Sequence, residues 1–361
     1  MRYLLAGFAL FGGVWGVLVP AAKAAPPEPL VLVGGGDTAY PTGWFSERAR
    51  KRGAGMFEPL QPILSSADLR FLNLESPVTK RKAIAKKKYP LVTHPDFLEI
   101  LTGAGFNLFS LANNHTGDAG PEGLTDTFGH LKRLQTPDRP LWWSGAGHDK
   151  ASRKKPVFFT IKGTRVALLS FRLSGSPLGN PMGAGASERQ IRAAAKQADV
   201  VIVSAHGGGE YKAVPGSWKA DKWRKMVDAG ADVVLGHGPH NPQGVEWYKG
   251  AAIYYSLGNL SFGTRPPTRR TGGMILKGLM ARVTLANGKV QKAEAIPLFV
   301  DNTRSWTAGG KTLKVQLFTP VPVVGPHFDV MLGEIRDWSA GIRGNKTKIK
   351  ACGTAYCFGA P

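Results

Sequence analysis

Two histidines, His237 and His240, occur in one short segment with glycine and proline that directly follows the apolar run 232–235. Four further apolar runs, 30–37, 69–75, 107–111 and 200–206, also end on or lead into a carboxylate, an amide or an imidazole. In chain order these groups are Asp37, Glu75, Asn113, Asn114, His115, His206, His237 and His240. Because ligands of open α/β sheets bind beyond the carboxyl ends of the strands, the pattern predicts one site at one sheet edge.

The residue types in this set are typical of metal ligands. We predict six of them to bind metal: Asp37, Glu75, Asn114, His206, His237 and His240. Mixed nitrogen and oxygen donors favour a divalent transition metal such as Mn, Zn, Fe or Co. A bridging carboxylate can hold two ions about 3.5–4 Å apart, so we expect one or two ions. His115 has no evident structural duty and is the candidate to protonate a leaving group.

Each of these groups also has a simpler interpretation. A single histidine at a strand end is more often a structural residue, and Asp37 could cap the turn after the three glycines 34–36. Asn113 and Asn114 could be ordinary turn residues. Five such coincidences in chain order are harder to explain this way, so we retain the metal-site hypothesis.

The elements that would position these groups follow from hydrophobic spacing. Apolar runs alternate with segments of helical spacing at 57–68, 95–104, 122–134, 187–198 and 219–229, which predicts a largely parallel sheet buried on both faces. Turn signals at 162–164, 249–250 and 287–288 predict antiparallel hairpins. The mixture predicts an α/β fold in which two mixed β-sheets pack face to face as a sandwich flanked by helices.

We expect three parts along the chain. Residues 1–24 resemble a signal peptide, with Arg2, an apolar core over 4–19 and the small-residue cleavage pattern Ala22-Lys23-Ala24. This predicts a periplasmic or secreted protein. The alternative is an uncleaved N-terminal membrane anchor, although the apolar run is shorter than the roughly 20 residues that span a bilayer.

Residues 25–302 form the main predicted domain, and 303–361 form a C-terminal extension with an expected helix over 328–342. In an exported chain, the two cysteines, Cys352 and Cys357, predict one disulfide that closes a small loop.

The charge balance indicates the kind of partner. Lys and Arg total 47 against 25 Asp and Glu, which gives a net charge of +22. Such a surface attracts polyanions. The chain contains no recognisable nucleic-acid-binding module, so we expect no nucleic acid as partner. Anionic lipid, teichoic or phosphate polymers and acidic peptide polymers all fit the charge. The simpler interpretation is a basic protein with a solvated charged surface.

Several ordered segments resemble the CapA family of capsule or poly-γ-glutamate synthesis proteins, which is itself similar to calcineurin-like metallophosphoesterases. The matching segments span about 30–263: Gly36-Asp37, Asn73-Leu74-Glu75-Ser76-Pro77, Ala112-Asn113-Asn114-His115, His206-Gly207 with Glu210-Tyr211, Gly236-His237 with Pro239-His240, and Tyr255-Ser256-Leu257-Gly258-Asn259. The resemblance implies a metallophosphatase-like sandwich.

The resemblance also implies residue roles. Asp37 and His240 would bind one ion, and Glu75 would bridge to a second ion. That second ion would be bound by Asn114, His206 and His237, with His115 as general acid.

The chain departs from the phosphoesterase pattern at two positions. Ala39 stands where those enzymes carry a second histidine, and Glu75 replaces the usual bridging aspartate. Glu210 is a candidate to compensate as a ligand or to contact substrate, and Asn113 and Asn259 are further candidates for substrate binding.

Three functions remain open from the sequence. The first is a secreted metal-dependent hydrolase or transferase that acts on an anionic envelope polymer, either poly-γ-glutamate or a peptidoglycan-like peptide. The second is a non-enzymatic assembly or export factor that binds capsule polymer for a membrane synthase complex. The third is a phosphoesterase for small phosphate esters.

Overall fold

The computed structural model describes residues 28–41, 44–183, 185–263, 277–300, 305–314 and 318–360. The expected signal peptide, 1–24, lies outside the described residues. So do residues 274–276, the start of the segment 274–298 in which the turn at 287–288 predicts a hairpin. Among the described residues, no helix is both long enough and apolar enough to cross a membrane.

The larger of two main sheets contains ten strands in the described part of the chain. Its central strand β1 (Leu30–Ala39) pairs in parallel with β2 (Leu69–Leu74) and antiparallel with β12 (Lys277–Ala286). The other strands are β3 (Leu108–Ser110), β4 (Trp142–Ser144), β11 (Asn259–Phe262), β13 (Lys289–Phe299), β16 (Val321–Pro322), β17 (Lys348–Cys352) and β18 (Ala355–Gly359). The order is β17-β18-β13-β12-β1-β2-β3-β4, with β11 beside β1 and β16 beside β13.

The smaller sheet has the order β5-β6-β7-β8-β10-β9. Its strands are β5 (Val157–Ile161), β6 (Thr164–Arg172), β7 (Val200–His206), β8 (Val233–His237), β9 (Val245–Tyr248) and β10 (Ala251–Tyr254). The four inner strands are parallel, whereas β5 and β9 pair antiparallel at the two edges. The antiparallel pairs β5–β6 and β9–β10 confirm the hairpins predicted at 162–164 and 249–250. A separate hairpin joins β14 (Ser305–Ala308) to β15 (Lys311–Lys314).

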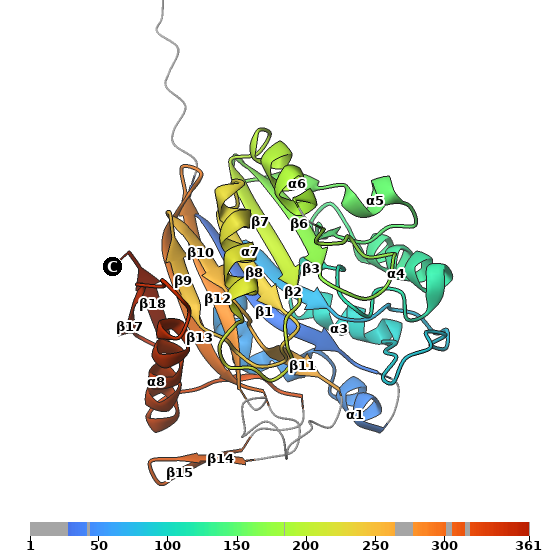
Figure 1. The fold of residues 1–361 in the computed structure, drawn as a ribbon. Helices are drawn as coiled ribbons and strands as arrows, with labels where there is room; N and C mark the ends of the chain where they lie inside the picture. The colour runs from blue at the N-terminus through green and yellow to red at the C-terminus, as the bar shows by residue number, and fades with distance from the viewer. Residues whose placement is uncertain are drawn as a thin grey trace, which may run out of the picture.

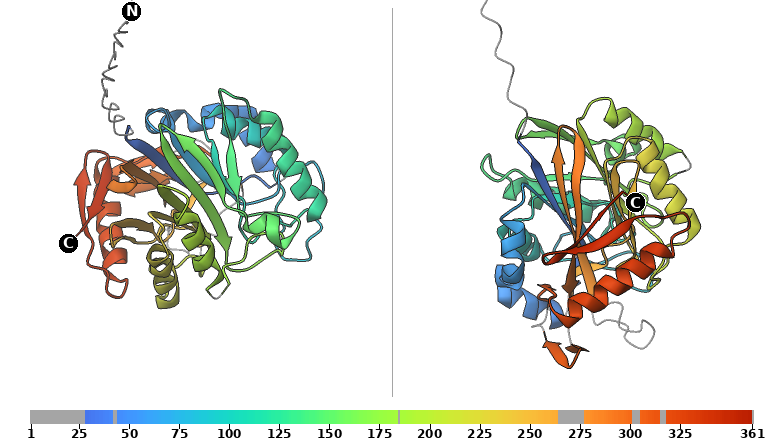
Figure 2. Two further views of the ribbon diagram at one scale, coloured as in Figure 1. Left: turned by 90° about the horizontal axis from the view of Figure 1, so that it is seen from above. Right: turned by 90° about the vertical axis from the view of Figure 1, so that its left-hand side faces the viewer.

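The two sheets pack face to face around one apolar core, which confirms the predicted sandwich of two mixed sheets (Figures 1 and 2). Inward-facing residues of both sheets form this core, for example Leu32, Phe71, Val200 and Leu235. A second apolar cluster lies between the larger sheet and its helices, which are α1 (Trp44–Arg52), the 3-10 helix η1 (Gly53–Leu60), α2 (Gln61–Leu64), α3 (Pro95–Gly103) and α4 (Gly120–Leu134).

A third cluster lies between the smaller sheet and the helices α6 (Ala186–Ala195) and α7 (Ser217–Asp228). The molecule therefore has four layers in the order helix, sheet, sheet, helix. The short helix α5 (Lys150–Lys154) precedes β5.

The segment 57–68 differs from the single α-helix that its spacing predicts. Its first part belongs to η1, and its next four residues form the short helix α2. Pro59 lies inside η1, and Pro62 lies at the start of α2. Since proline lacks an N–H and clashes with the preceding turn, these two residues interrupt a continuous α-helix.

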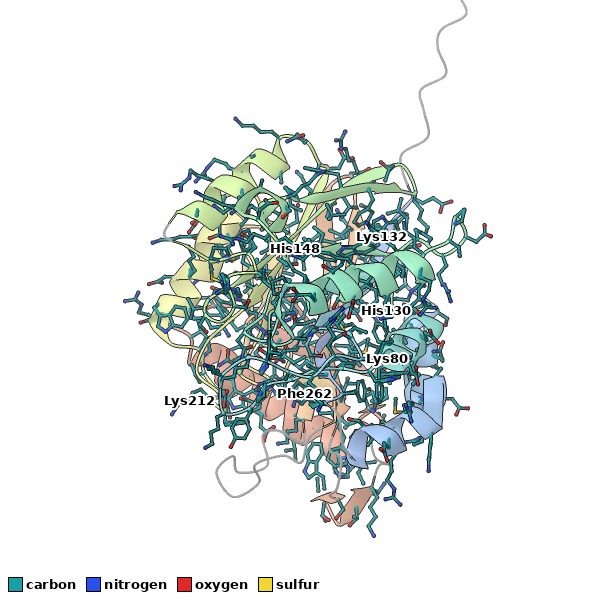
Figure 3. The ribbon with its side chains drawn as sticks, turned by 90° about the vertical axis from the view of Figure 1, so that its right-hand side faces the viewer. Lys80, His130, Lys132, His148, Lys212 and Phe262 are labelled. Atoms are coloured by element: carbon teal, nitrogen blue, oxygen red, sulfur yellow. A yellow bond between two sulfur atoms is a disulfide. The ribbon has the colours of Figure 1, made fainter. Side chains whose placement is uncertain are left out.

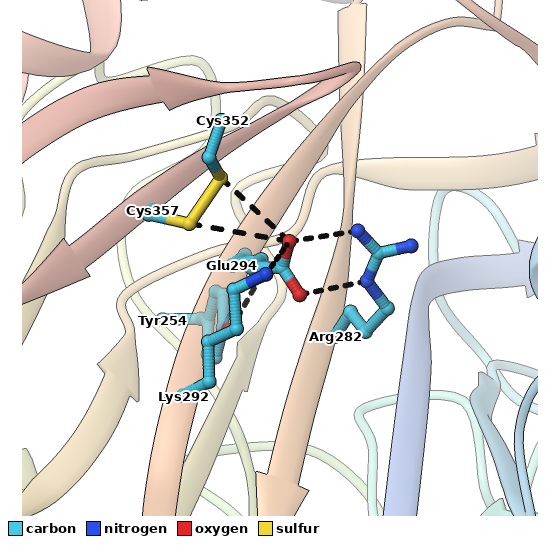
Figure 4. Close-up of a disulfide and its surroundings, with 6 residues drawn as sticks. All are labelled: Tyr254, Arg282, Lys292, Glu294, Cys352 and Cys357. Carbon is cyan, nitrogen blue, oxygen red and sulfur yellow. Dashed lines mark hydrogen bonds and ion pairs between the residues drawn. A yellow bond between two sulfur atoms is a disulfide. The ribbon is translucent and has the colours of Figure 1, made fainter.

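The C-terminal residues complete the larger sheet. Helix α8 (Pro326–Ala340) overlaps the predicted 328–342, and the β17–β18 hairpin pairs with β13. Cys352 and Cys357 form a disulfide within this hairpin (Figure 4). Glu294 of β13 lies beside the disulfide and forms ion pairs with Arg282 and Lys292. The pairing of β18 with β13 attaches the last strands to the main sheet.

Candidate metal centre

Two neighbouring parallel strands, β7 and β8, bring two histidines to the same level. His206 pairs with His237 in the strand register. In β7, Ile202 faces the core between the sheets and Val203 faces the helices, so strand alternation directs His206 between the sheets. In β8, Leu235 faces the same core and places His237 on the same side.

Asp37 reaches this space because β1 contains a bulge. Gly34 pairs with Phe71 of β2, but Asp37 pairs with Asn73, so three steps along β1 oppose two along β2. A one-residue bulge exchanges the two faces of the strand beyond it. Asp37 therefore takes the inward direction that strict alternation would have given to Gly36.

Asp37 is fully buried at the centre of a polar network. Its Oδ1 accepts a hydrogen bond from Asn73 Nδ2 at 2.8 Å and lies 3.2 Å from His237 Nδ1. Its Oδ2 accepts a hydrogen bond from the backbone N–H of Gly238 at 3.0 Å and lies 3.5 Å from His240 Nδ1. Burial alone would raise the pKa of Asp37, but contact with His237 and the charges of the neighbouring histidines lower it below its ordinary value.

Glu75 follows β2 and is also fully buried. Among the described residues, neither of its carboxylate oxygens has a hydrogen-bond partner. Its Oε1 lies 3.5 Å from His206 Nε2 and 3.9 Å from His240 Nε2. Burial, together with the charges of Asp37 and Glu210, raises the pKa of Glu75 well above its ordinary value. A buried carboxylate without partners is costly, and a bound cation would remove that cost.

Other buried ligand atoms share this lack of partners. In the described part of the chain, both ring nitrogens of His237 and the Oδ1 atom of Asn114 make no hydrogen bond. Donor atoms of Asp37, Glu75 and His206 all lie within 4.8 Å of one another. Burial lowers the pKa of His206 to about 3, which keeps its ring neutral, as a metal ligand must be. The donor set therefore fits a divalent transition metal.

His240 is held by a residue on a different strand. It has a positive φ of 60°, and its Nδ1 lies 2.9 Å from Asn259 Oδ1. Asn259 begins β11 and pairs in register with Asp37. A hydrogen bond at Nδ1 fixes the ring and leaves Nε2, on the side of Glu75, for a metal. Asn259 therefore orients His240, and its predicted contact with substrate stays a prediction.

Asn113 supports the site from the loop after β3. Its side chain is fully buried, and Nδ2 donates to the backbone oxygen of Leu74 at 2.8 Å and to Asn73 Oδ1 at 3.3 Å. Its Oδ1 accepts the backbone N–H of His115 at 3.0 Å. Since both ends of the amide bond to protein groups, Asn113 is part of this scaffold, and its predicted role in substrate binding stays a prediction.

His115 belongs to a small charged cluster. Its Nδ1 lies 2.7 Å from Asp118 Oδ2 and 2.9 Å from Lys87 Nζ, and Lys87 Nζ also lies 2.7 Å from Asp118 Oδ1. Burial lowers the pKa of His115, and the neighbouring Asp118 opposes that shift. Because Nδ1 is occupied by these contacts, Nε2 is the ring nitrogen left for proton transfer.

The structure adds three residues to those found in the sequence: Asn73, Asp118 and Lys87. Strand alternation could have found Asn73, which precedes Glu75 by two positions. Asp118 lies three residues after His115, and this spacing only weakly indicated that the two side chains interact. The sequence gave no signal for the contact between Lys87 and His115, because Lys87 reaches the ring from a loop 28 positions away. Glu210 is exposed, so its role as ligand or substrate contact stays a prediction.

The fold and the site together describe an α/β sandwich with nitrogen and oxygen donors at one edge. The chain belongs to the family described as bacterial capsule synthesis protein PGA_cap, whose sequence pattern matches residues 31–264. This match confirms the family resemblance found in the sequence and spans all six proposed ligands.

Two curated relatives carry related names. The PGA biosynthesis protein CapA of Bacillus subtilis is 33% identical over 225 residues, which cover 59% of this chain and 58% of that protein. The capsule biosynthesis protein CapA of Bacillus anthracis is 34% identical over 224 residues, covering 57% and 53%. The matched region therefore spans little more than half of each relative.

Among solved structures, a phosphatase from Mycoplasma pneumoniae is similar with a TM-score of 0.48 and 17% identity. The match covers 76% of this chain and 94% of that one.

Proposed function

We propose that this protein is a metal-dependent hydrolase or transferase that acts on an acidic, amide-linked polymer of the cell envelope, with poly-γ-glutamate as the first candidate. The observation that carries the proposal is Glu75, a buried carboxylate with two unpartnered oxygens beside His206 and His240. The names of the two relatives and the net charge of +22 support an anionic polymer as substrate.

Six side chains would hold one or two ions: Asp37, Glu75, Asn114, His206, His237 and His240. A bound Mn, Zn or Fe ion would act as a Lewis acid and lower the pKa of a bound water. Asn73 and Asn259 fix the directions of Asp37 and His240, so the donors need little rearrangement to bind.

His115 would serve as the proton donor. Cleavage of an amide breaks the C–N bond, and the leaving nitrogen must receive a proton. Asp118 stabilises the protonated ring through Nδ1, which leaves the Nε2 proton for the leaving group. Lys87 adds a positive charge beside His115, where a substrate carboxylate could bind.

The proposal includes export, with residues 1–24 as a cleaved signal peptide. An N-terminal anchor is the alternative, and either arrangement would place the site on the side of the membrane where envelope polymers are assembled. Sequencing the N-terminus of the mature protein distinguishes them, because cleavage leaves a chain that starts at Ala25.

The test combines element analysis with polymer turnover. Purified protein should contain bound transition metal and should shorten poly-γ-glutamate with release of new amines. His237→Ala should lose both metal and turnover. His115→Ala should keep its metal but lose about 100-fold or more in turnover. His130→Ala, on α4, is the matched control and should change neither. Protein without bound metal, or metal-loaded protein without turnover, would contradict the proposal.

A second candidate function is a non-enzymatic factor that binds capsule polymer for a membrane synthase. The specific observations are the charge of +22 and Ala39 at the position where related phosphoesterases carry a second histidine. This function predicts polymer binding that survives chelation and His115→Ala. A panel of chromogenic phosphate esters, assayed with and without metal, tests the phosphoesterase alternative.

A further inference from the structure

A cavity lies away from the metal ligands, where the edges of the two sheets meet. It has a volume of about 570 Å³, and helix α4, strands β4 and β5 and the segment between them line it. β4 is the last strand of the larger sheet at this end, and β5 is the last strand of the smaller sheet. We call it the edge groove and define it by Phe128, Lys132, Trp143, His148, Lys155 and Phe158.

The edge groove begins one strand away from the metal centre. Ser144 at the end of β4 accepts a hydrogen bond from the backbone N–H of Leu111, and Gly145 packs against Ala112. Asn114, a proposed ligand, follows Ala112 by two residues. A polymer chain lying in the edge groove would therefore approach the same sheet edge that carries the ligands.

The backbone of Trp143 is available for hydrogen bonding in the edge groove. Trp142 and Ser144 direct their backbone groups to the β3 side, since Trp142 N–H donates to Asn107 and Ser144 C=O accepts from Leu111. In a parallel pair, alternate residues face opposite sides, so the N–H and C=O of Trp143 face the open edge. An added chain containing amide groups can pair with such an edge.

The charged groups of the edge groove are positive. Lys132 and Lys155 are exposed, the His148 ring is exposed beside them, and no aspartate or glutamate among the described residues lines the cavity. The adjacent Asp149 uses its Oδ1 to cap α5 through the N–H groups of Ala151 and Ser152. Figure 3 shows Lys132 and His148 on the same face as Lys80 and His130. The edge groove is thus complementary to an anion.

The apolar surface of the edge groove comes from half-buried rings. Phe128, Trp143 and Phe158 line it. Phe128 contacts His148 edge-on at 6.0 Å between ring centroids, and the Arg165 guanidinium lies 5.4 Å from the Phe158 ring. Such rings can contact the methylene groups of a polymer while the lysines bind its charges.

We propose that the edge groove binds a segment of a carboxylate-bearing polyamide at a distance from the bond that reacts. The polymer's carboxylates pair with Lys132 and Lys155, its amides pair with the Trp143 backbone, and its methylene groups lie on the aromatic rings. This inference rests on the proposed function for the identity of the polymer, but the binding itself requires no metal.

The test measures binding of fluorescently labelled poly-γ-glutamate by anisotropy, in chelator and at about 0.15 M salt. The double variant Lys132→Glu/Lys155→Glu should have a Kd at least about tenfold higher than the control double variant Lys348→Glu/Lys350→Glu. The control lysines are exposed on β17 and carry the same change in charge. Circular dichroism confirms that both pairs are folded.

An equal loss of affinity in both double variants would overturn the inference, because polymer binding would then respond only to the overall charge of the protein. If polyphosphate binds as tightly as poly-γ-glutamate, and the Lys132 and Lys155 variants weaken its binding equally, the groove does not select a polyamide and the inference is overturned. His237→Ala should lose turnover but keep specific binding in the edge groove, which separates this inference from the proposed function. In the unmodified, metal-loaded protein, specific binding without any turnover would support the edge groove and refute the enzyme. Turnover without a specific effect of the two lysines would do the reverse.

Discussion

Replacing Glu75 by glutamine separates the stability of the protein from its capacity to bind metal. Both oxygens of the Glu75 carboxylate are buried without a hydrogen-bond partner among the described residues, and the nearby Asp37 adds a second negative charge. Glutamine has nearly the same shape but no charge. We expect Glu75→Gln to stabilise the metal-free protein and to remove the stabilisation that metal provides.

The magnitude follows from the cost of burying polar groups. An unsatisfied buried polar group costs roughly 1–3 kcal/mol, and a charged one costs more. Glutamine at this position still has an unpaired amide, so the gain without metal is about 1–2 kcal/mol. In the unmodified protein, metal at about 1,000 times its Kd adds about 4 kcal/mol. The order of stability of the two proteins should therefore reverse when metal is added.

Urea unfolding in chelator and in excess Mn²⁺ or Zn²⁺ measures both effects. The control is Glu246→Gln, which changes a buried carboxylate that has partners. Glu246 Oε1 lies 2.9 Å from Arg224 Nη2, and Tyr255 donates to Oε2 at 2.6 Å. Since removing one partner of a buried ion pair costs about 3–5 kcal/mol, the control should be destabilised in both conditions.

The reasoning is refuted if Glu75→Gln loses as much stability in chelator as Glu246→Gln does. That result would mean that the Glu75 carboxylate is already satisfied within the protein. Equal stabilisation of the unmodified and Glu75→Gln proteins by metal would refute the assignment of Glu75 as a ligand.

Three further predictions concern other parts of the molecule. Asp118→Asn should lower turnover of poly-γ-glutamate about 10- to 100-fold while metal content stays unchanged, because Asp118 holds the ring of His115; loss of metal would contradict this role. Burial lowers the pKa of Lys219 to about 7, so the unfolded chain binds more protons than the folded protein between about pH 7 and pH 10. Stability should therefore rise with pH across that window, and Lys219→Met should abolish the rise in urea midpoints; a persistent rise would count against Lys219 as its source. Gly36→Ala should cost roughly 1–3 kcal/mol or more, because its β-carbon would lie 2.0 Å from the backbone oxygen of Gly258. Gly55→Ala, with no atom within 4 Å of its β-carbon, is the control and should be nearly neutral in the same urea experiment.

The sequence predicted the fold class because its signals are local. Apolar runs and helical spacing identified β7, β8, α3, α4 and α7, and turn residues identified the hairpins of the smaller sheet. Short or very polar elements were missed: the spacing gave no signal for α1, β4 or β11. Three-residue β4 is defined by its partner β3 more than by its own residues, so local propensity could not reveal it.

The sequence also predicted which residues gather at the edge of the sheets, since polar groups at the ends of parallel strands share that edge. It gave incomplete roles to the supporting residues. Asn113 and Asn259 were expected to contact substrate, which stays a prediction; that their side chains also hold His115 and His240 was not foreseen. Spacing along the chain cannot distinguish an amide that faces a ligand from one that bonds to a neighbouring residue.

By itself, the sequence determined the family, the sandwich of two mixed sheets and the types of donor atom, because these depend on composition, periodicity and the order of motifs. Only the tertiary structure decided which face Asp37 occupies, how Lys87 reaches His115 and where the edge groove opens. Those features depend on a one-residue register shift, a long loop and the meeting of two strands from different sheets. Each is set by packing between segments that are distant in the chain.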